Sequence, residues 1–176
     1  MISALFSRGA AGIPAPTPLD FVTLQLPPSP NTCLLTPSVA PGQGHLQRDP
    51  LPASPEAVMA ALDRVAGGMP RTFPLARFPA RNQAQWVVRS ALMNYPDIVV
   101  AEAAPVEGGT GLWMYSRSLI GWSDLGVNRA RVMAWLEAQF SPAGWPAAGG
   151  RRSRRSGCRR HAQGGASGRA HCRPDC

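Results

Sequence analysis

Apolar residues recur at two spacings along the chain, and each spacing predicts one kind of element. In two stretches they lie three or four positions apart, which gathers their side chains along one side of a helix. The first stretch predicts a helix over 55–66 that begins after the capping residue Ser54 and ends at Gly67-Gly68. The second predicts a helix over about 127–140, ended by Ser141-Pro142. The two apolar stripes are Val58, Ala61, Leu62 and Val65, and Val132, Met133, Leu136 and Phe140.

Between these helices the apolar residues follow one another more closely and include many β-branched and aromatic side chains. They predict strands over 84–93, 97–104 and 111–119, with a hairpin turn at Glu107-Gly108-Gly109-Thr110. In the third strand neither set of alternating side chains is strongly polar, so both faces of the sheet should be partly covered. The fold class that follows is α+β, with a small antiparallel sheet and two helices packed on one of its faces.

The N-terminal third of the chain is rich in proline and harder to assign. Residues 1–19 predict an irregular lead-in, and 20–26 a short edge strand that ends at Pro27-Pro28. Residues 27–52 contain too many prolines for a regular element. Within them, Cys33-Leu34-Leu35 is apolar enough to lie against a core.

Positive charge is concentrated at the end of the chain. Eight of the 18 arginines lie after residue 150 with one acidic residue, whereas residues 1–150 contain ten arginines and nine acids. After Trp145 there is no large apolar residue, so this segment cannot bury enough apolar area to offset its ordering entropy. We expect a single α+β domain over 20–140 and a disordered Arg/Gly-rich tail over 141–176. The nearly neutral domain gives no reason to infer nucleic-acid binding.

A polar turn with a glycine joins the third strand to the second helix. Ser123 and Asp124 precede that helix, where side-chain oxygens can accept from backbone N–H groups, so a structural turn that includes Gly126 is the favoured interpretation. In the alternative, Gly126 allows close backbone approach, and Asn128 and Arg129 present donors to an anionic ligand. Asp124 would repel such an anion. The anion site therefore stays a hypothesis for Asn128 and Arg129.

Arg117, on the third strand, is a further candidate for contact with an anionic ligand. Its simplest role is an ion pair with Asp97 or Glu102 on the neighbouring strand. A buried Arg117 directed at Asp124 would instead tie the strand to the turn. An exposed Trp122 in the same turn would indicate a surface for a protein partner.

No motif indicates a catalytic centre or a cofactor. Cys33 and His45 are the only cysteine and histidine before residue 150, and their Pro-rich loop gives no reason for contact between them. The spacing of cysteines and histidines in the tail fits zinc only loosely, and we predict no metal site there. The tail arginines can contact nucleic acid or an acidic membrane without sequence selectivity. The weak metal candidates are Cys158, His161, His171, Cys172 and Cys176.

Several segments, in the same order, resemble a bacterial family known only as the domain of unknown function 1499 family. The resemblance covers about residues 20–139 and implies a compact α+β domain with no established activity, substrate or cofactor. Members often follow a membrane anchor or an export signal, which implies association with the cell envelope. The segments are Asp20-Phe21, Ser29-Pro30-Asn31 with Cys33-Leu34, Pro70-Arg71-Thr72, Tyr95-Pro96-Asp97, Tyr115-Ser116-Arg117-Ser118 and, above all, residues 121–129.

The sequence by itself predicts a cytoplasmic protein, because no apolar run is long enough for a transmembrane helix. We expect a non-enzymatic binding or structural module whose site, for an anionic ligand or a protein partner, lies at residues 117–129. Two alternatives stay open. One is an enzyme that uses Arg117, Asp124 and Arg129, and the other is non-specific nucleic-acid binding through the tail.

Overall fold

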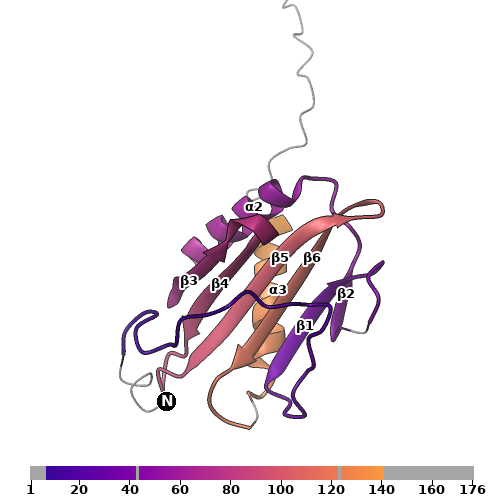
Figure 1. Ribbon diagram of the computed structural model, residues 1–176. Coiled ribbons are helices and arrows are strands. Elements are labelled where there is room, and N and C mark those ends of the chain that lie inside the picture. The colour runs from indigo at the N-terminus through magenta and orange to yellow at the C-terminus, as the bar shows by residue number, and fades with distance from the viewer. Residues whose placement is uncertain (1–6, 43, 123, 141–176) are drawn as a thin grey trace, which may run out of the picture.

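Six strands form one mixed sheet, and two helices cover one of its faces (Figure 1). The computed structural model describes residues 7–42, 44–122 and 124–140, and the predicted tail lies outside them. The α+β class is confirmed. Across the sheet the strand order is β2-β1-β6-β5-β4-β3. The elements are β1 (Thr32–Pro37), β2 (Leu46–Arg48), α2 (Pro55–Gly68), β3 (Thr72–Phe78), the 3-10 turn η1 (Pro79–Arg81), β4 (Gln83–Arg89), β5 (Pro96–Val106), β6 (Gly109–Ser118) and α3 (Val127–Phe140).

Both helices and the second and third predicted strands form where the sequence predicts them, whereas β4 ends at Arg89, four residues before the end predicted for the first strand. The Ser54 hydroxyl accepts the Ala57 N–H at 3.2 Å, so α2 begins with the predicted cap and runs two residues past the predicted end. α3 covers the predicted range. β4, β5 and β6 form an antiparallel ladder, and β5 and β6 join through the predicted hairpin.

The prediction of a purely antiparallel sheet is wrong, because β2 runs parallel to β1 at one edge. The chain turns back tightly after β1. At Gly44 an added Cβ would lie 2.8 Å from the Leu46 carbonyl oxygen, so only glycine fits this close return. His45 completes it, since its Nδ1 accepts the Leu34 N–H at 2.9 Å. The prolines of this region did not prevent strand formation because Pro37 stands at the end of β1.

The prediction of an edge strand over 20–26 is also wrong. Asp20 Oδ1 accepts the Val22 N–H at 3.0 Å, and this side-chain bond holds residues 21–23 in a turn. The edge on this side of the sheet is β3, which the sequence pattern does not reveal because Pro74 interrupts it. Proline is tolerated there because β3 is the outermost strand and its register with β4 shifts between Pro74 and Ala76.

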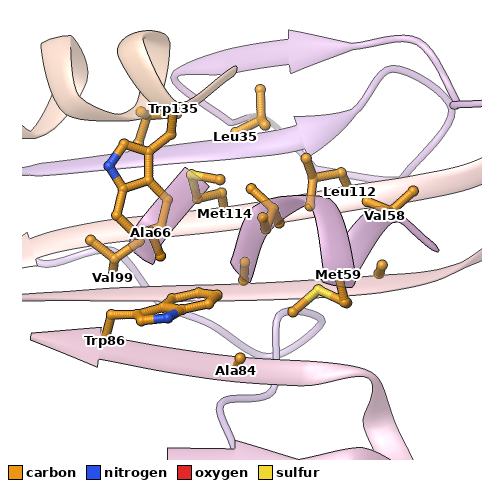
Figure 2. Close-up of a cluster of buried hydrophobic side chains, with 14 of the residues drawn as sticks. Leu35, Val58, Met59, Ala66, Ala84, Trp86, Val99, Leu112, Met114 and Trp135 are labelled. Carbon is orange, nitrogen blue, oxygen red and sulfur yellow. The ribbon is translucent and has the colours of Figure 1, made fainter. Parts of the chain in front are cut away.

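The main hydrophobic core lies between the sheet and the two helices (Figure 2). Alternate side chains of the strands point into it, among them Val99 of β5 and Met114 of β6. Trp86 of β4 packs edge to face against Trp135 of α3, with ring centroids 5.4 Å apart and ring planes at 76°. Cys33 and Leu35 of β1 also lie in this core, as expected.

The opposite face of the sheet is covered by residues 7–27, which we call the N-terminal strap; Figure 1 shows it as the indigo segment that crosses the strands. Outward-facing side chains of β4 hold it. Leu19 and Gln83 exchange two hydrogen bonds, from the Leu19 N–H to Oε1 (2.8 Å) and from Nε2 to the Leu19 carbonyl (2.7 Å). Gln85 donates to the Thr17 carbonyl, and Arg89 to the Gly9 carbonyl. Both faces of the sheet are therefore covered, as the pattern of the third predicted strand indicates.

Candidate functional site

A cavity of about 750 Å³ lies between the N-terminal strap and the sheet, and we call it the outer-face groove. This volume is within the range of about 300–1,000 Å³ that is usual for small-molecule sites. Its lining is mostly aliphatic and proline side chains, with a few polar groups toward one end. The residues are Ile13, Pro14, Ala15, Pro16, Thr17, Pro18, Leu19, Leu24, Gln25 and Pro27 of the strap, and Leu75, Gln85, Ile98, Val100, Tyr115, Arg117, Ser118 and Leu119 of the sheet side.

The register of the central strands assembles the floor of this groove. Val100 lies opposite Gln85 on one side and Tyr115 on the other, which forms one row of side chains across three strands. Ile98 lies opposite Arg117 in the next row. Because side chains alternate along a strand, all of these point away from the helices and toward the strap.

Arg117 and Tyr115 supply the polar chemistry of the groove. Arg117 is exposed, and among the described residues no hydrogen bond or ion pair is formed by its guanidinium. Tyr115 is only 4 % exposed, and its burial raises the pKa of its hydroxyl, although the Arg117 charge acts in the opposite direction. A permanent cation and a neutral hydroxyl therefore lie beside an apolar floor.

The predicted ion pairs of Arg117 are wrong. Asp97 points to the helix side of the sheet, where its Oδ2 lies 2.6 Å from Nη2 of Arg131. Glu102 is on the same face of the sheet as Arg117, but it lies opposite Trp113, four residues before Arg117 on β6. Its Oε2 pairs instead with Nε of Arg81 at 3.3 Å. Arg117 is also not directed at Asp124, because β6 turns its side chain to the other face of the sheet.

On the helix side, the turn before α3 forms a buried polar network centred on Asn128. Asp124 Oδ1 accepts the Gly126 N–H (3.0 Å), and its Oδ2 accepts both the backbone N–H and the amide of Asn128 (2.6 Å each). Asn128 is fully buried and also donates to the Asn31 carbonyl (2.8 Å) and to Ser118 Oγ (3.1 Å). The carboxylate of Asp124 thus occupies the helix start where an external anion would bind, and the amide of Asn128 is already engaged.

Arg131 connects this network to the sheet. Its Nη1 donates to Ser116 Oγ (2.9 Å) and to Asn128 Oδ1 (2.6 Å), while Nη2 pairs with Asp97. Sequence analysis missed Arg131. Two features of the sequence could have indicated Arg131. Asp97 alternates with Ile98, which faces the strap, so the partner of Asp97 must come from a helix on the other face. Arg131 also lies three residues after Asn128 and therefore on the same side of α3.

The three candidates for an anion site are not brought together. Arg117 lies in the outer-face groove, whereas Asn128 is buried on the other side of the sheet. Arg129 is exposed, and its Nη1 donates to the His45 carbonyl at 3.2 Å. Gly126 adopts a φ of +84°, a backbone conformation that favours glycine. Ser123 and the tail candidates Cys158, His161, His171, Cys172 and Cys176 lie outside the described residues.

A family model described as "Protein of unknown function (DUF1499)" matches residues 23–138. The chain belongs to the DUF1499 family. No curated protein and no solved structure matches it. The matched residues of the DUF1499 domain include all six strands, α2 and all but the last two residues of α3, but only the last part of the strap. Much of one wall of the groove therefore lies outside the match.

Cys33 and His45 of this DUF1499 domain are both engaged within the fold. Burial raises the pKa of the Cys33 thiol, and Nδ1 of His45 is occupied by the Leu34 N–H. Within residues 7–42, 44–122 and 124–140, no three His, Cys, Asp or Glu side chains are grouped so that they could hold a metal ion. In the same part of the chain, no helix is both long and apolar enough to cross a membrane.

Proposed function

We propose that this protein is a non-enzymatic binding module whose outer-face groove takes a small amphipathic anion. The ligand has an apolar body and a single acidic head, such as a carboxylate or a phosphate monoester. The observation that carries the proposal is the position of Arg117, a cation at the edge of an apolar cavity of about 750 Å³. Arg117 has no acidic partner among the residues that the structure describes.

The groove suits the two parts of such a ligand separately. Leu24, Leu75 and Leu119 offer partly exposed apolar surface, and covering it contributes roughly 25 cal/mol for each Å² removed from water. Ile98 and Val100 form a floor that the strap already buries. A guanidinium is planar and can donate two parallel hydrogen bonds to a carboxylate or phosphate. The Tyr115 hydroxyl, which also has a side-chain hydrogen bond with Thr32, can add a third donor.

An enzyme in this groove is disfavoured by the side chains that line it. The described lining includes no carboxylate, histidine or cysteine, so the Thr17 and Ser118 hydroxyls in it have no general base beside them to activate them as nucleophiles. An amphipathic ligand is compatible with the envelope association that the family resemblance implies. We include association with the cell envelope in the proposal.

The test compares two exposed arginines on opposite sides of the sheet. Isothermal titration with decanoate, below its micelle concentration, measures affinity for wild type, Arg117→Gln and Arg129→Gln, with decanol as the uncharged probe. We expect Arg117→Gln to weaken decanoate binding about tenfold or more, since hydrogen bonds to charged groups contribute about 1.5–3 kcal/mol. Arg129→Gln, the matched control, should bind decanoate like wild type, and decanol should not distinguish the three proteins.

A second variant tests the apolar part of the groove. Leu75→Trp places a larger side chain at the partly buried edge of the floor and should weaken decanoate and decanol alike. The proposal fails if wild type does not bind decanoate, or if Arg117→Gln binds it as tightly as wild type. Loss of binding only in Arg129→Gln would place the anion at the start of α3 instead.

A further inference from the structure

Two turns leave the sheet at the same end, and together they form a surface separate from the residues that line the groove. Arg89 at the end of β4 pairs with Pro96 at the start of β5, and Asp97 pairs with Ser118 at the end of β6. Residues 90–95, 120–122 and 124–126 therefore project from one end of the sheet, the lower end in Figure 1. We call these turns, with the first residue of α3, the loop end.

Large apolar side chains are exposed at the loop end. Leu92 is 92 % and Leu125 95 % exposed, and Trp122 is 69 % exposed. Met93 and Val127 are about half exposed. The other exposed large apolar residues of the described chain lie singly on separate elements. None of the five is needed to close the core, because the side chains that fill it come from the strands and the inner sides of the helices.

The charges around these side chains are one-sided. Arg71, whose Nη2 donates to Asn94 Oδ1, and Arg129 are both exposed there. The acids of this end are already engaged: Asp97 pairs with Arg131, and Asp124 accepts the N–H groups at the start of α3. The opposite end carries Glu107 in the β5–β6 turn and Glu56, which contacts Asn82 after η1. The end that exposes apolar side chains is thus the end with uncompensated positive charge.

We propose that the loop end docks on a membrane surface that contains acidic lipids. Trp122, Leu125 and Leu92 enter the interface, and Arg71 and Arg129 contact the headgroups. Leu92 and Leu125 are each more than 90 % exposed and project from separate turns. A lipid interface is deformable and can surround each of them. Tryptophan favours the boundary between headgroups and acyl chains, and arginine is attracted to acidic headgroups. A protein partner would instead need a pocket for each projecting side chain.

The test measures binding of the full chain to sedimented vesicles of phosphatidylcholine, with and without phosphatidylglycerol. The double variant Leu92→Ser, Leu125→Asn removes both projecting leucines, and asparagine tolerates the φ of +54° at position 125. We expect its partition coefficient on the acidic vesicles to fall at least about tenfold, the effect of losing the burial of one leucine. Val22→Ser is the matched control, since Val22 is 91 % exposed but lies on the strap. Its neighbour Asp20 pairs with Arg81 of η1, so Val22 is remote from the loop end.

A second readout separates insertion from charge attraction, because the arginines after residue 150 draw every variant to acidic lipid alike. Brominated lipids quench a tryptophan that enters the interface, and Trp122→Phe should remove most of that quenching. Equal partition of wild type and the double leucine variant would overturn the proposal, as would quenching that persists in Trp122→Phe. Failure of wild type to bind acidic vesicles would also overturn it and would leave a protein partner as the occupant. Decanoate affinity in the groove is not affected by any of these outcomes.

Discussion

The two faces of the same sheet are covered in different ways, and they differ in what they can do. On the helix side, side chains from α2 and α3 fill the space above the strands. On the strap side, a cavity of about 750 Å³ is left between the covering segment and the strands. Ile13, Leu19 and Phe21 of the strap pack against the outer side chains of β4 and β5. Pro14, Pro16 and Pro18 stand between them in place of a periodic apolar stripe, so the strap does not fill the whole outer face as a helix would. Room for a ligand exists on the face that is covered irregularly.

The charged groups follow the same division. Asp97 and Arg131 on the helix side are 7 % and 10 % exposed and satisfy each other. Arg117 on the strap side is exposed beside an apolar floor. The same residue type therefore supports the fold on one face and remains available to a ligand on the other.

Removing Asp97 should have the largest effect on stability. Asp97→Ala leaves the Arg131 charge buried without its partner, and breaking such a pair typically costs about 3–5 kcal/mol. Arg117→Ala, on the other face, should change the free energy of unfolding by no more than about 0.5 kcal/mol. Urea unfolding of the two variants measures the contrast. Similar losses for both would mean that Arg117 also supports the fold and is not reserved for a ligand.

Periodicity in the sequence was sufficient for the elements whose side chains alternate or repeat without interruption. Both helices and the β5–β6 hairpin belong to this group, because an apolar stripe or a Gly-Gly turn is visible within a few residues. β1, β2 and β3 were not predicted. In each of them proline or a tight return obscures the pattern. β1 is held in addition by the distant β6, as the bond from the Ser118 N–H to the Asn31 carbonyl shows, whereas β2 and β3 pair with the strands next to them in the chain.

The opposite faces of one strand offer a second contrast in stability. Val99 and Val100 are neighbours on β5, but Val99 is fully buried under the helices and Val100 borders the groove. Val99→Ala creates a new cavity and should cost about 2–3 kcal/mol, whereas Val100→Ala enlarges an existing one and should cost about 1 kcal/mol. Differential scanning calorimetry of the two variants measures the difference between their stabilities. Both substitutions lose the same β-propensity, so that loss cancels in the comparison. A larger cost at Val100 would show that the groove is tightly packed in solution.

The candidate site was only partly accessible from the sequence. The capping role of Asp124 was predicted from its position before α3, but Asn128 was predicted as a donor to an anionic ligand and is instead bonded to Asp124. The groove could not be predicted, because its walls are residues 13–27 and strands that begin some 50 residues later. Their proximity depends on Gln83 and Gln85, whose side chains resemble ordinary solvent-facing positions of a strand until the strap is placed across them.

The attachment of the strap should be the weakest of the three contrasts, and it is best measured locally. Gln83→Leu removes both hydrogen bonds to Leu19, which together contribute about 1–3 kcal/mol. It also removes the side-chain bonds of Gln83 to Glu102 and Gln85, which do not involve the backbone of β5. The Leu19 amide proton should then exchange with solvent roughly tenfold faster in NMR experiments, while the amide protons of β5 exchange as in wild type. Gln85→Leu is the control, because it frees the Thr17 carbonyl and leaves the partner of the Leu19 N–H in place. If exchange in β5 accelerates equally in Gln83→Leu, the strap and the sheet open as one unit. In that case a ligand could reach the groove only when the whole domain opens, and the proposed binding role would need a different entrance.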